Sequence, residues 1–302
     1  MTECERLIEN GTFSPDFFKE EVRCDFLVTT ERKKIWAIEL DLLLKFDEVC
    51  KRNGLKYFLA EGSLLGAVRH KGFIPWDDDT DVVMPREDYE KLLTLGREFA
   101  EPYFLQIPGG DNGYYFSFAK LRNSNTTGVG IPFRYERFNQ GIGIDIFVLD
   151  TVDLSKDEVG YTRISDLIRQ NSAYMRKSNL NPTEEDVKRI ASYGVIDPVA
   201  NLAEINQIAT SHMNKDTGFV GIMSCTIYPY LRHVWQKEAF ADRVLLPVEN
   251  FKFPAPIGFD HILSTTYGDY LTFPPKEKRG QWHQTTEIKP DVSFRKYLQM
   301  HN

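Results

Sequence analysis

Residues 57–92 read YFLAEGSLLGAVRHKGFIPWDDDTDVVMPREDYEKL. This segment contains an apolar run, a Gly-Ser pair and a cluster of aspartates, and each of them predicts a structural feature. Its first residues, Tyr57 to Ala60, form an apolar run that predicts a strand. Gly62 and Ser63 interrupt this run, and Leu64 to His70 predicts a short helix. Backbone N–H groups at a helix N-terminus bind phosphate. The turn therefore predicts a phosphate site, where the glycine permits close approach and Ser63 donates, although a Gly-Ser pair alone is usually a simple turn.

The same segment contains four aspartates within residues 77–81. Asp79 and Asp81 are two residues apart, and on a strand such residues face the same side. Both carboxylates could then hold one hard cation, and Mg²⁺ (or Mn²⁺) suits a few carboxylates together with substrate phosphates. A solvated acidic turn is the simplest alternative. It is disfavoured because the cluster is flanked by apolar residues and because clustered carboxylates repel one another without a cation.

A calcium-binding loop is a second alternative for the acidic cluster. Its spacing matches the first positions of an EF-hand, but Val82 stands where that loop needs a glycine. A glycosyltransferase that binds a nucleotide sugar through Asp-x-Asp is a third. The Gly-Ser turn about sixteen residues before the acids favours a nucleotidyltransferase-like site instead.

Asp145 supplies a third candidate carboxylate. It lies between Ile144 and Ile146 in the apolar segment Ile142 to Val148, which predicts a buried strand. A charge buried in a strand is costly unless it is paired or bound to a metal. Asp150 could take the same role, but its position at the strand end suggests capping. Two carboxylates on one strand and a third on a neighbour resemble the nucleotidyltransferase superfamily.

Composition narrows the class of protein. The 302 residues carry a formal net charge of −7, which disfavours nucleic acid as a partner because such binding needs Lys and Arg. Mean hydropathy is −0.38, and no apolar run reaches the roughly 18 residues of a membrane span, so only peripheral membrane association is open. The N-terminus lacks a secretory signal. No cysteine lies in a CxxC pair. Together these features predict a cytoplasmic protein.

The patterning predicts an α+β fold. Residues 1–150 should contain N-terminal helices and a nucleotidyltransferase-like mixed sheet with flanking helices, and residues 151–302 a mostly helical C-terminal part packed on that core. The absence of a Gly/Ser/Pro linker predicts one compact body. Four helices are expected: Thr29 or Thr30 to Arg52 with a stop at Gly54, Arg86 to about Ala100, 162–177 and 183–214. Two further strands are expected, Phe116 to Arg122 and Ile142 to Leu149.

These motifs resemble the LicD family of phosphocholine transferases, relatives of fukutin. The likeness covers residues 30–285. It departs from many members at Glu61-Gly62-Ser63, where they have Gly-Gly-Thr, although the turn and the hydroxyl are kept. Besides 57–92, the matching segments are Lys120-Leu121-Arg122, Ile144 to Asp150, Tyr267-Gly268-Asp269-Tyr270, Pro274-Pro275, Arg279 and His283, in the expected order.

The resemblance implies metal-dependent transfer of a phospho-alcohol, phosphocholine first, from a CDP-linked donor such as CDP-choline. The acceptor would be a cell-surface glycan or its precursor, including a lipid-linked glycan, in lipopolysaccharide, teichoic acid or capsule. Two other functions stay open: a nucleotide-sugar glycosyltransferase and a catalytically inactive nucleotide-binding module. All three carboxylates are present, which disfavours the inactive module.

Each candidate residue has an expected role. Asp79 and Asp81 would hold Mg²⁺ or Mn²⁺ on the donor diphosphate, and Asp145 would complete the site or act as general base. The expected substrate-binding residues are Gly62, Ser63, Arg69, Lys120, Arg122, Arg279 and His283. Arg69 could instead be a helix-end cation, Lys120 and Arg122 could pair with the acidic cluster, and His283 could be structural. Trp76, Trp282 and Tyr267 could form a cation–π box for choline, with core packing as the alternative.

Overall fold

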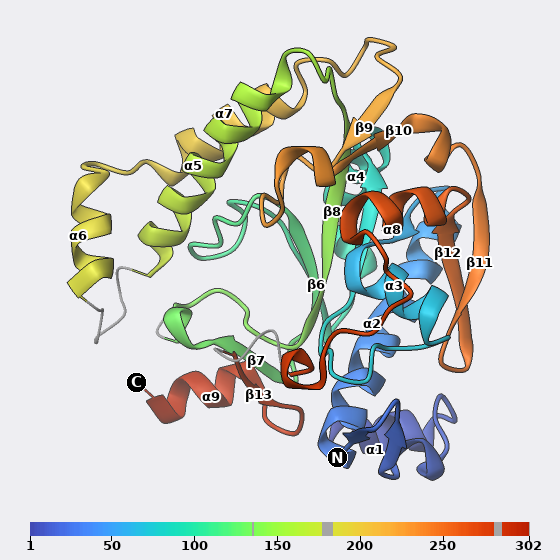
Figure 1. Cartoon of the computed structure of the whole chain (residues 1–302). Coiled ribbons are helices and arrows are strands. Elements are labelled where there is room, and N and C mark those ends of the chain that lie inside the picture. The colour runs from blue at the N-terminus through green and yellow to red at the C-terminus, as the bar shows by residue number, and fades with distance from the viewer. Residues whose placement is uncertain (135, 177–183, 281–285, 302) are drawn as a thin grey trace.

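The fold is built on a mixed sheet that places the two acid-bearing strands side by side. The computed structural model describes residues 1–134, 136–176, 184–280 and 286–301. The sheet has the order β10-β9-β8-β4-β3, and β6 pairs with both β8 and β5 (Figure 1). Its strands are β3 (Phe58–Leu59), β4 (Asp81–Pro85), β5 (Tyr103–Gln106), β6 (Ala119–Asn123), β8 (Gly143–Thr151), β9 (Phe219–Gly221) and β10 (Val234–Gln236).

Strand β8 is the centre of this sheet. It pairs in parallel with β4 and antiparallel with β6 and β9. The remaining strands form two-stranded sheets: β1 (Glu21–Arg23) with β2 (Phe26–Val28), β11 (Arg243–Val248) with β12 (Phe251–Pro256), and β7 (Thr127–Gly130) with β13 (Thr286–Lys289). The α+β class predicted from the sequence is confirmed.

Helices surround the sheets. They are α1 (Glu3–Glu9), α2 (Thr30–Asn53), α3 (Glu61–Arg69), α4 (Arg86–Leu93), α5 (Asp157–Met175), α6 (Glu184–Ser192), α7 (Pro198–Ala209), α8 (Phe259–Tyr267) and α9 (Phe294–His301). Short 3₁₀ turns are Pro15–Phe18, Gly96–Glu98, Ile131–Phe133, Tyr230–Arg232, Lys237–Phe240 and Lys276–Lys278. Within the described residues, no helix combines the length and apolarity that crossing a membrane requires.

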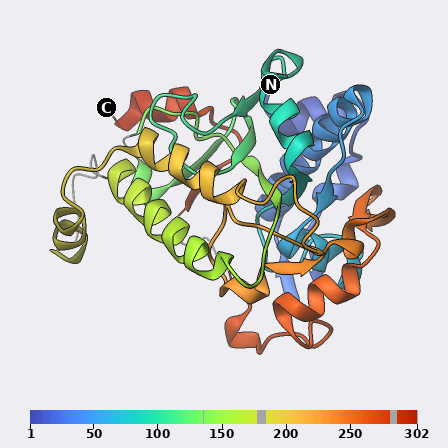
Figure 2. The same ribbon diagram turned by 90° about the horizontal axis from the view of Figure 1, so that it is seen from above.

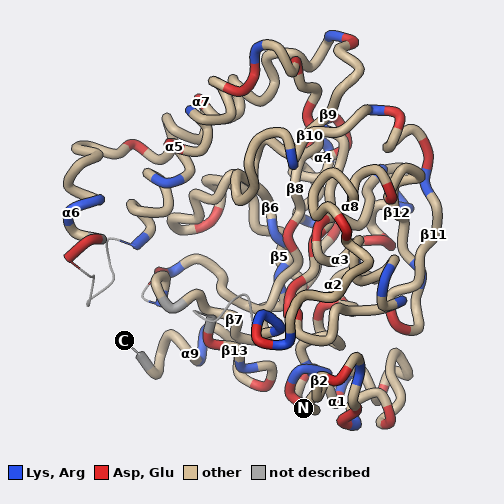
Figure 3. The backbone as a smooth tube through the Cα atoms, viewed as in Figure 1, with Lys and Arg blue, Asp and Glu red and all other residues tan. Residues whose placement is uncertain are grey.

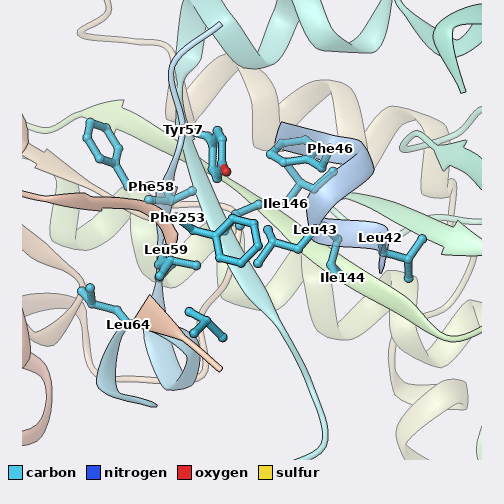
Figure 4. Packing of buried hydrophobic residues seen from close by; sticks show 14 of the residues in the cluster. Leu42, Leu43, Phe46, Tyr57, Phe58, Leu59, Leu64, Ile144, Ile146 and Phe253 are labelled. Atoms are coloured by element: carbon cyan, nitrogen blue, oxygen red, sulfur yellow. The ribbon is translucent and has the colours of Figure 1, made fainter. Parts of the chain in front are cut away.

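Helix α2 follows the predicted signals at both ends. Thr29 accepts a hydrogen bond from the Arg32 N–H at its start, and Gly54 ends it in the left-handed conformation at φ 65°. Its apolar side packs on the main sheet. Figure 4 shows residues from α2, β3, β8 and β12 in one buried cluster, including Leu43, Ile146 and Phe253. Each such side chain contributes about 1.5–3 kcal/mol when fully buried, which holds the acid-bearing strands in place.

The second half of the chain contributes both helices and strands. Helices α5 and α7 run side by side and bury Ile164, Leu167 and Ile205 between them (Figure 2). Strands β9 and β10 extend the main sheet from the same half, and β13 pairs with β7. The helical part is therefore present but interleaved with strands. The division at residue 150 falls at the end of β8 and stays a prediction, because segments from both sides share one sheet.

Candidate active site

Asp81 and Asp145 meet at one end of the parallel strand pair. They are register partners on β4 and β8, and the Asp145 N–H donates to the Thr80 carbonyl at 2.9 Å. Side chains at matched positions on adjacent strands face the same side of a sheet. Asp79 precedes β4 and lines the same cavity as Asp145. Strand register thus brings Asp81 beside Asp145, and Asp79 shares a cavity wall with Asp145.

The first turn of α3 is hydrogen-bonded to this acidic segment. Ser63 Oγ accepts from the Asp81 N–H at 2.9 Å, and the Ala60 N–H donates to the Asp81 carbonyl at 3.0 Å. A Cβ at Gly62 would lie 2.9 Å from Asp77 Oδ2, so a larger residue would displace that carboxylate. A hydroxyl that accepts still has one proton to donate. Ser63 can therefore fix Asp81 and still donate to a phosphate.

Negative charge accumulates around Asp81, because Asp79, Asp145 and Glu61 lie near it. Figure 3 shows several acidic positions, in red, near the labels of α3 and β8. Burial raises the pKa of Asp81 well above its usual range, and Asp79 and Asp145 raise it further. Burial and the charge of Asp79 likewise raise the pKa of Glu39, which is 1% exposed and accepts from the Thr80 hydroxyl at 3.2 Å. Both pKa values are raised by burial and by repulsion between neighbouring carboxylates. Carboxylate oxygens with excess negative charge fit a hard divalent cation.

Lys120 partly offsets this charge. Its Nζ lies 2.5 Å from Asp145 Oδ1, because β6 places Lys120 opposite Asp145 in register. The ion-pair alternative raised by the sequence is therefore what the structure contains. In the part of the chain that the structure describes, no three His, Cys, Asp or Glu side chains are grouped as a ready-made metal site. Asp145, one of the predicted ligands, is engaged by Lys120 instead.

Arg122 is held by its own partners. Its Nε donates to Gln106 Oε1 at 2.6 Å and its guanidinium donates to the Gly141 carbonyl at 2.7 Å. Burial lowers the pKa of this guanidinium. Arg122 nevertheless lines the cavity beside Lys120, so its positive charge faces the site although its bonds are structural.

The cavity has a volume of about 200 Å³. It is bounded by polar groups at the acidic end and by apolar and aromatic side chains. Sequence reasoning missed several of its residues: a charge within the apolar face of α2 was a usable signal for Glu39, whereas no motif marked the phenylalanines. The cavity residues are Ile35, Glu39, Asp78, Asp79, Phe116, Lys120, Arg122, Gly128, Gly130, Phe133, Phe138, Gln140, Gly141, Ile142, Gly143, Asp145 and Ile288.

Arg69 and Arg279 lie in a different cluster, around Phe273. Their guanidinium carbons are 5.2 and 5.4 Å from that ring, and Arg279 also lies 4.9 Å from the Trp76 ring. Arg69 donates to the Tyr270 carbonyl at 2.8 Å. Neither arginine lines the cavity described above, and phosphate binding by them stays a prediction.

The expected choline box is only partly covered by the structure. Trp76 is buried and packs against Arg279, so core packing describes it better than a ligand box. Tyr267 donates to Glu61 Oε2 at 3.2 Å. His283 and Trp282 lie outside the described residues, and their predicted roles stay predictions.

Comparison with known proteins agrees with this geometry. A family model for the LicD/FKTN/FKRP nucleotidyltransferase domain matches residues 54–185. The chain is 26% identical to the lipopolysaccharide cholinephosphotransferase LicD of Haemophilus influenzae over 253 residues, which cover 81% of this chain and 92% of that protein. It is 30% identical to an uncharacterised protein of Rickettsia prowazekii, across 55% of this chain and 53% of that one. The mannosyltransferase regulator 4 of Saccharomyces cerevisiae is 23% identical across 61% of this chain but only 16% of its own length. The matched residues include Asp79, Asp81 and Asp145, so the three candidate carboxylates lie in the segment that is similar to the LicD/FKTN/FKRP nucleotidyltransferase domain.

Proposed function

We propose that this chain transfers a phospho-alcohol, phosphocholine first, from a CDP-linked donor to a cell-surface glycan or its precursor. The observation that carries the proposal is the register pairing of Asp81 with Asp145, beside Asp79 and a cavity. The similarity to a lipopolysaccharide cholinephosphotransferase supports the transferred group and the kind of acceptor. The donor follows from the CDP-alcohol chemistry that the sequence resemblance implies.

A divalent cation, Mg²⁺ or Mn²⁺, is part of this proposal. Asp79, Asp81 and Asp145 would hold it, and it would neutralise charge on the donor diphosphate. Support comes from the accumulated acids, whose mutual repulsion and burial raise the pKa of Asp81. Asp145 would have to exchange its Lys120 partner for the cation, which releases the lysine toward phosphate.

The protein groups then have distinct tasks. The N–H groups at the start of α3 and the Ser63 hydroxyl would bind phosphate oxygens, together with Lys120. The acceptor hydroxyl oxygen would form a bond to the phosphorus that carries the alcohol, while the bond from that phosphorus to the CMP oxygen breaks. The hydroxyl proton would pass to a carboxylate, for which Asp145 is the candidate. The products are CMP and a phosphodiester. Such transfer depends chiefly on positioning and charge neutralisation.

The lining of the cavity supports a donor with a cationic headgroup. Its wall includes the aromatic rings of Phe116, Phe133 and Phe138 and the carboxyl groups of Glu39 and Asp79, and the cations Lys120 and Arg122 line it as well. A quaternary ammonium has no N–H to donate, so aromatic faces and carboxylates are its recognition elements. Ribitol or glycerol would instead need several hydrogen-bonding partners for their hydroxyls. Because of this wall, we propose choline rather than ribitol or glycerol as the alcohol of the donor.

The compartment is also a proposal. Cys4, Cys24, Cys50 and Cys225 are all free thiols. Free cysteines fit a reducing environment. We therefore propose that the reaction takes place in the cytoplasm.

A thermal-shift experiment tests the donor class. The purified chain is heated with Mg²⁺ and CDP-choline, CDP-ribitol, CDP-glycerol or a UDP-sugar. A ligand stabilises the folded state according to its concentration and affinity. CDP-choline should raise the unfolding temperature most, and Asp79→Asn should reduce the rise. A larger rise with a UDP-sugar would favour the glycosyltransferase alternative.

A further inference from the structure

Glu61 has a backbone conformation that its residue type disfavours. Its φ is 44°, in the left-handed region where glycine is the least costly residue. A non-glycine residue there is strained and persists only where its surroundings compensate. The Glu61 side chain is also buried, at 8% exposure. A strained backbone and a buried carboxylate at one position call for a compensating role.

Two residues from the far end of the chain contact this carboxylate. His233, just before β10, places Nε2 3.2 Å from Glu61 Oε1, and Tyr267, at the end of α8, donates to Oε2 at 3.2 Å. The His233 Nδ1 lies 3.1 Å from the Cys225 carbonyl, which only accepts, so Nδ1 carries a proton. Nε2 is buried and has no hydrogen bond of ordinary geometry. Glu61 is therefore the polar group toward which this nitrogen is directed.

The network leads directly to Asp81. Glu61 lies between Ala60 and Ser63, the two residues that hydrogen-bond the Asp81 backbone on its carbonyl and N–H sides. Figure 1 shows α8 beside α3, and the two helices contact each other. His233 and Tyr267 both lie outside residues 54–185, which the family model matches.

We propose that Glu61 is a positioning residue, and that the Tyr267 hydroxyl fixes its carboxylate beside His233, so that the start of α3 holds Asp81 in place. The segment beyond the nucleotidyltransferase domain thus completes the active site. The effect on catalysis rests on the proposed function. The effect on the turn does not, because it depends only on contacts within the folded chain.

Two tyrosines provide a matched test. Tyr267→Phe removes the hydroxyl that donates to Glu61, and Tyr270→Phe removes one that donates to Asp260 at 2.6 Å in the same segment. With CDP-choline, Tyr267→Phe should lower kcat about tenfold, the scale seen for groups that orient site residues. The KM should change little, and the unfolding temperature should fall no more than in the control. Equal kcat values for the two variants would overturn the proposal.

Substitution of Glu61 itself separates positioning from chemistry. Glu61→Gln keeps an oxygen that accepts from Tyr267, whereas Glu61→Gly removes the side chain and suits the φ of 44°. The Gln variant should keep more activity than the Gly variant, and the Gly variant should be folded. Full activity of Glu61→Gly, or equal loss in both variants, would contradict a positioning role.

Hydrogen exchange supplies a readout independent of turnover. Amides of residues 60–66 and of Asp81 should exchange faster in Tyr267→Phe than in Tyr270→Phe, with or without a donor. If the wild type releases no CMP from any donor, the proposed function fails while this comparison still tests the positioning. Identical exchange in the two variants overturns the positioning itself.

Discussion

Asp81 on β4 and Asp145 on β8 are register partners across a parallel strand pair. One pairing therefore sets the separation of two carboxylates that are 64 positions apart in the sequence. The apolar cluster behind the strands, shared by α2, β3 and β12, fixes that pairing. The acids are consequently held close despite their repulsion, which a bound cation would relieve.

The first prediction concerns Asp79. Asp79→Asn should lower turnover at least about a hundredfold, the scale on which one electrostatic stabiliser acts, and leave the unfolding temperature near the wild-type value. EDTA should inactivate the wild type. The measurement is CMP release by the two proteins with and without Mg²⁺. Substantial activity in the variant, or full wild-type activity in EDTA, would refute the metal assignment.

Lys120 gives a second prediction. It pairs with Asp145 and lines the cavity, so we expect it to bind donor phosphate. Lys120→Met should raise the KM for the donor about tenfold, which corresponds to loss of roughly one charged hydrogen bond. Lys91→Met, at an exposed helical position, serves as the control. A wild-type KM for the donor in both variants would contradict phosphate binding by Lys120.

Asp150 and Asp145 should differ in what they support. Asp150 is 2% exposed in its side chain and makes a two-pronged pair with Arg86 at 2.7 and 2.9 Å. Asp150→Ala should cost about 3–5 kcal/mol in the free energy of unfolding, because Arg86 stays buried without its partner. Asp145→Asn should cost less than about 1 kcal/mol but abolish turnover. Denaturant unfolding and CMP release measure both quantities, and a reversed pattern would assign the third carboxylate to Asp150.

Titration of Glu39 should make the free energy of unfolding depend on pH. Its folded-state pKa is raised above the ordinary value of 4.5 by burial and by Asp79. The stability that its carboxyl contributes is therefore fully present below pH 4.5 and is lost as the pH rises toward the folded-state pKa. Glu39→Gln cannot titrate. The variant should gain unfolding temperature relative to the wild type as the pH rises from 4.5 to 8, measured without metal. A difference that is constant or shrinks with pH would contradict this.

Local signals explain what was predictable from the sequence. The bounds of α2 were predicted to within about a residue from the cap at Thr29, the stop at Gly54 and the apolar spacing. Each of these signals acts within a few positions of the chain. Long helices were less certain. The helix predicted from Arg86 to Ala100 ends at Leu93, with a 3₁₀ turn at Gly96–Glu98. The helix predicted over 183–214 is divided by Gly194 at φ 65° and by Pro198, which begins α7.

Long-range pairing explains what was not predictable. Asp79, Asp81 and Asp145 were chosen by residue type and strand neighbours, and one strand pair is enough to bring Asp81 and Asp145 into register. Glu61 has no distinguishing pattern, because its partners are more than 170 positions away and belong to no motif with it. The strands β9 and β10 were also missed, since three residues are too few for a periodicity.

Release of CMP from CDP-choline is the most direct test of the proposed transfer. The purified chain is incubated with Mg²⁺, a glycan acceptor extract and, in separate reactions, CDP-choline, CDP-ribitol, CDP-glycerol or a UDP-sugar, with Asp79→Asn as the matched control. We predict acceptor-dependent CMP release from CDP-choline that the variant lacks. Release from CDP-ribitol or CDP-glycerol alone would reject choline and keep the CDP-alcohol class. Nucleoside diphosphate release from a UDP-sugar, with no CMP from any CDP-linked donor, would contradict the account.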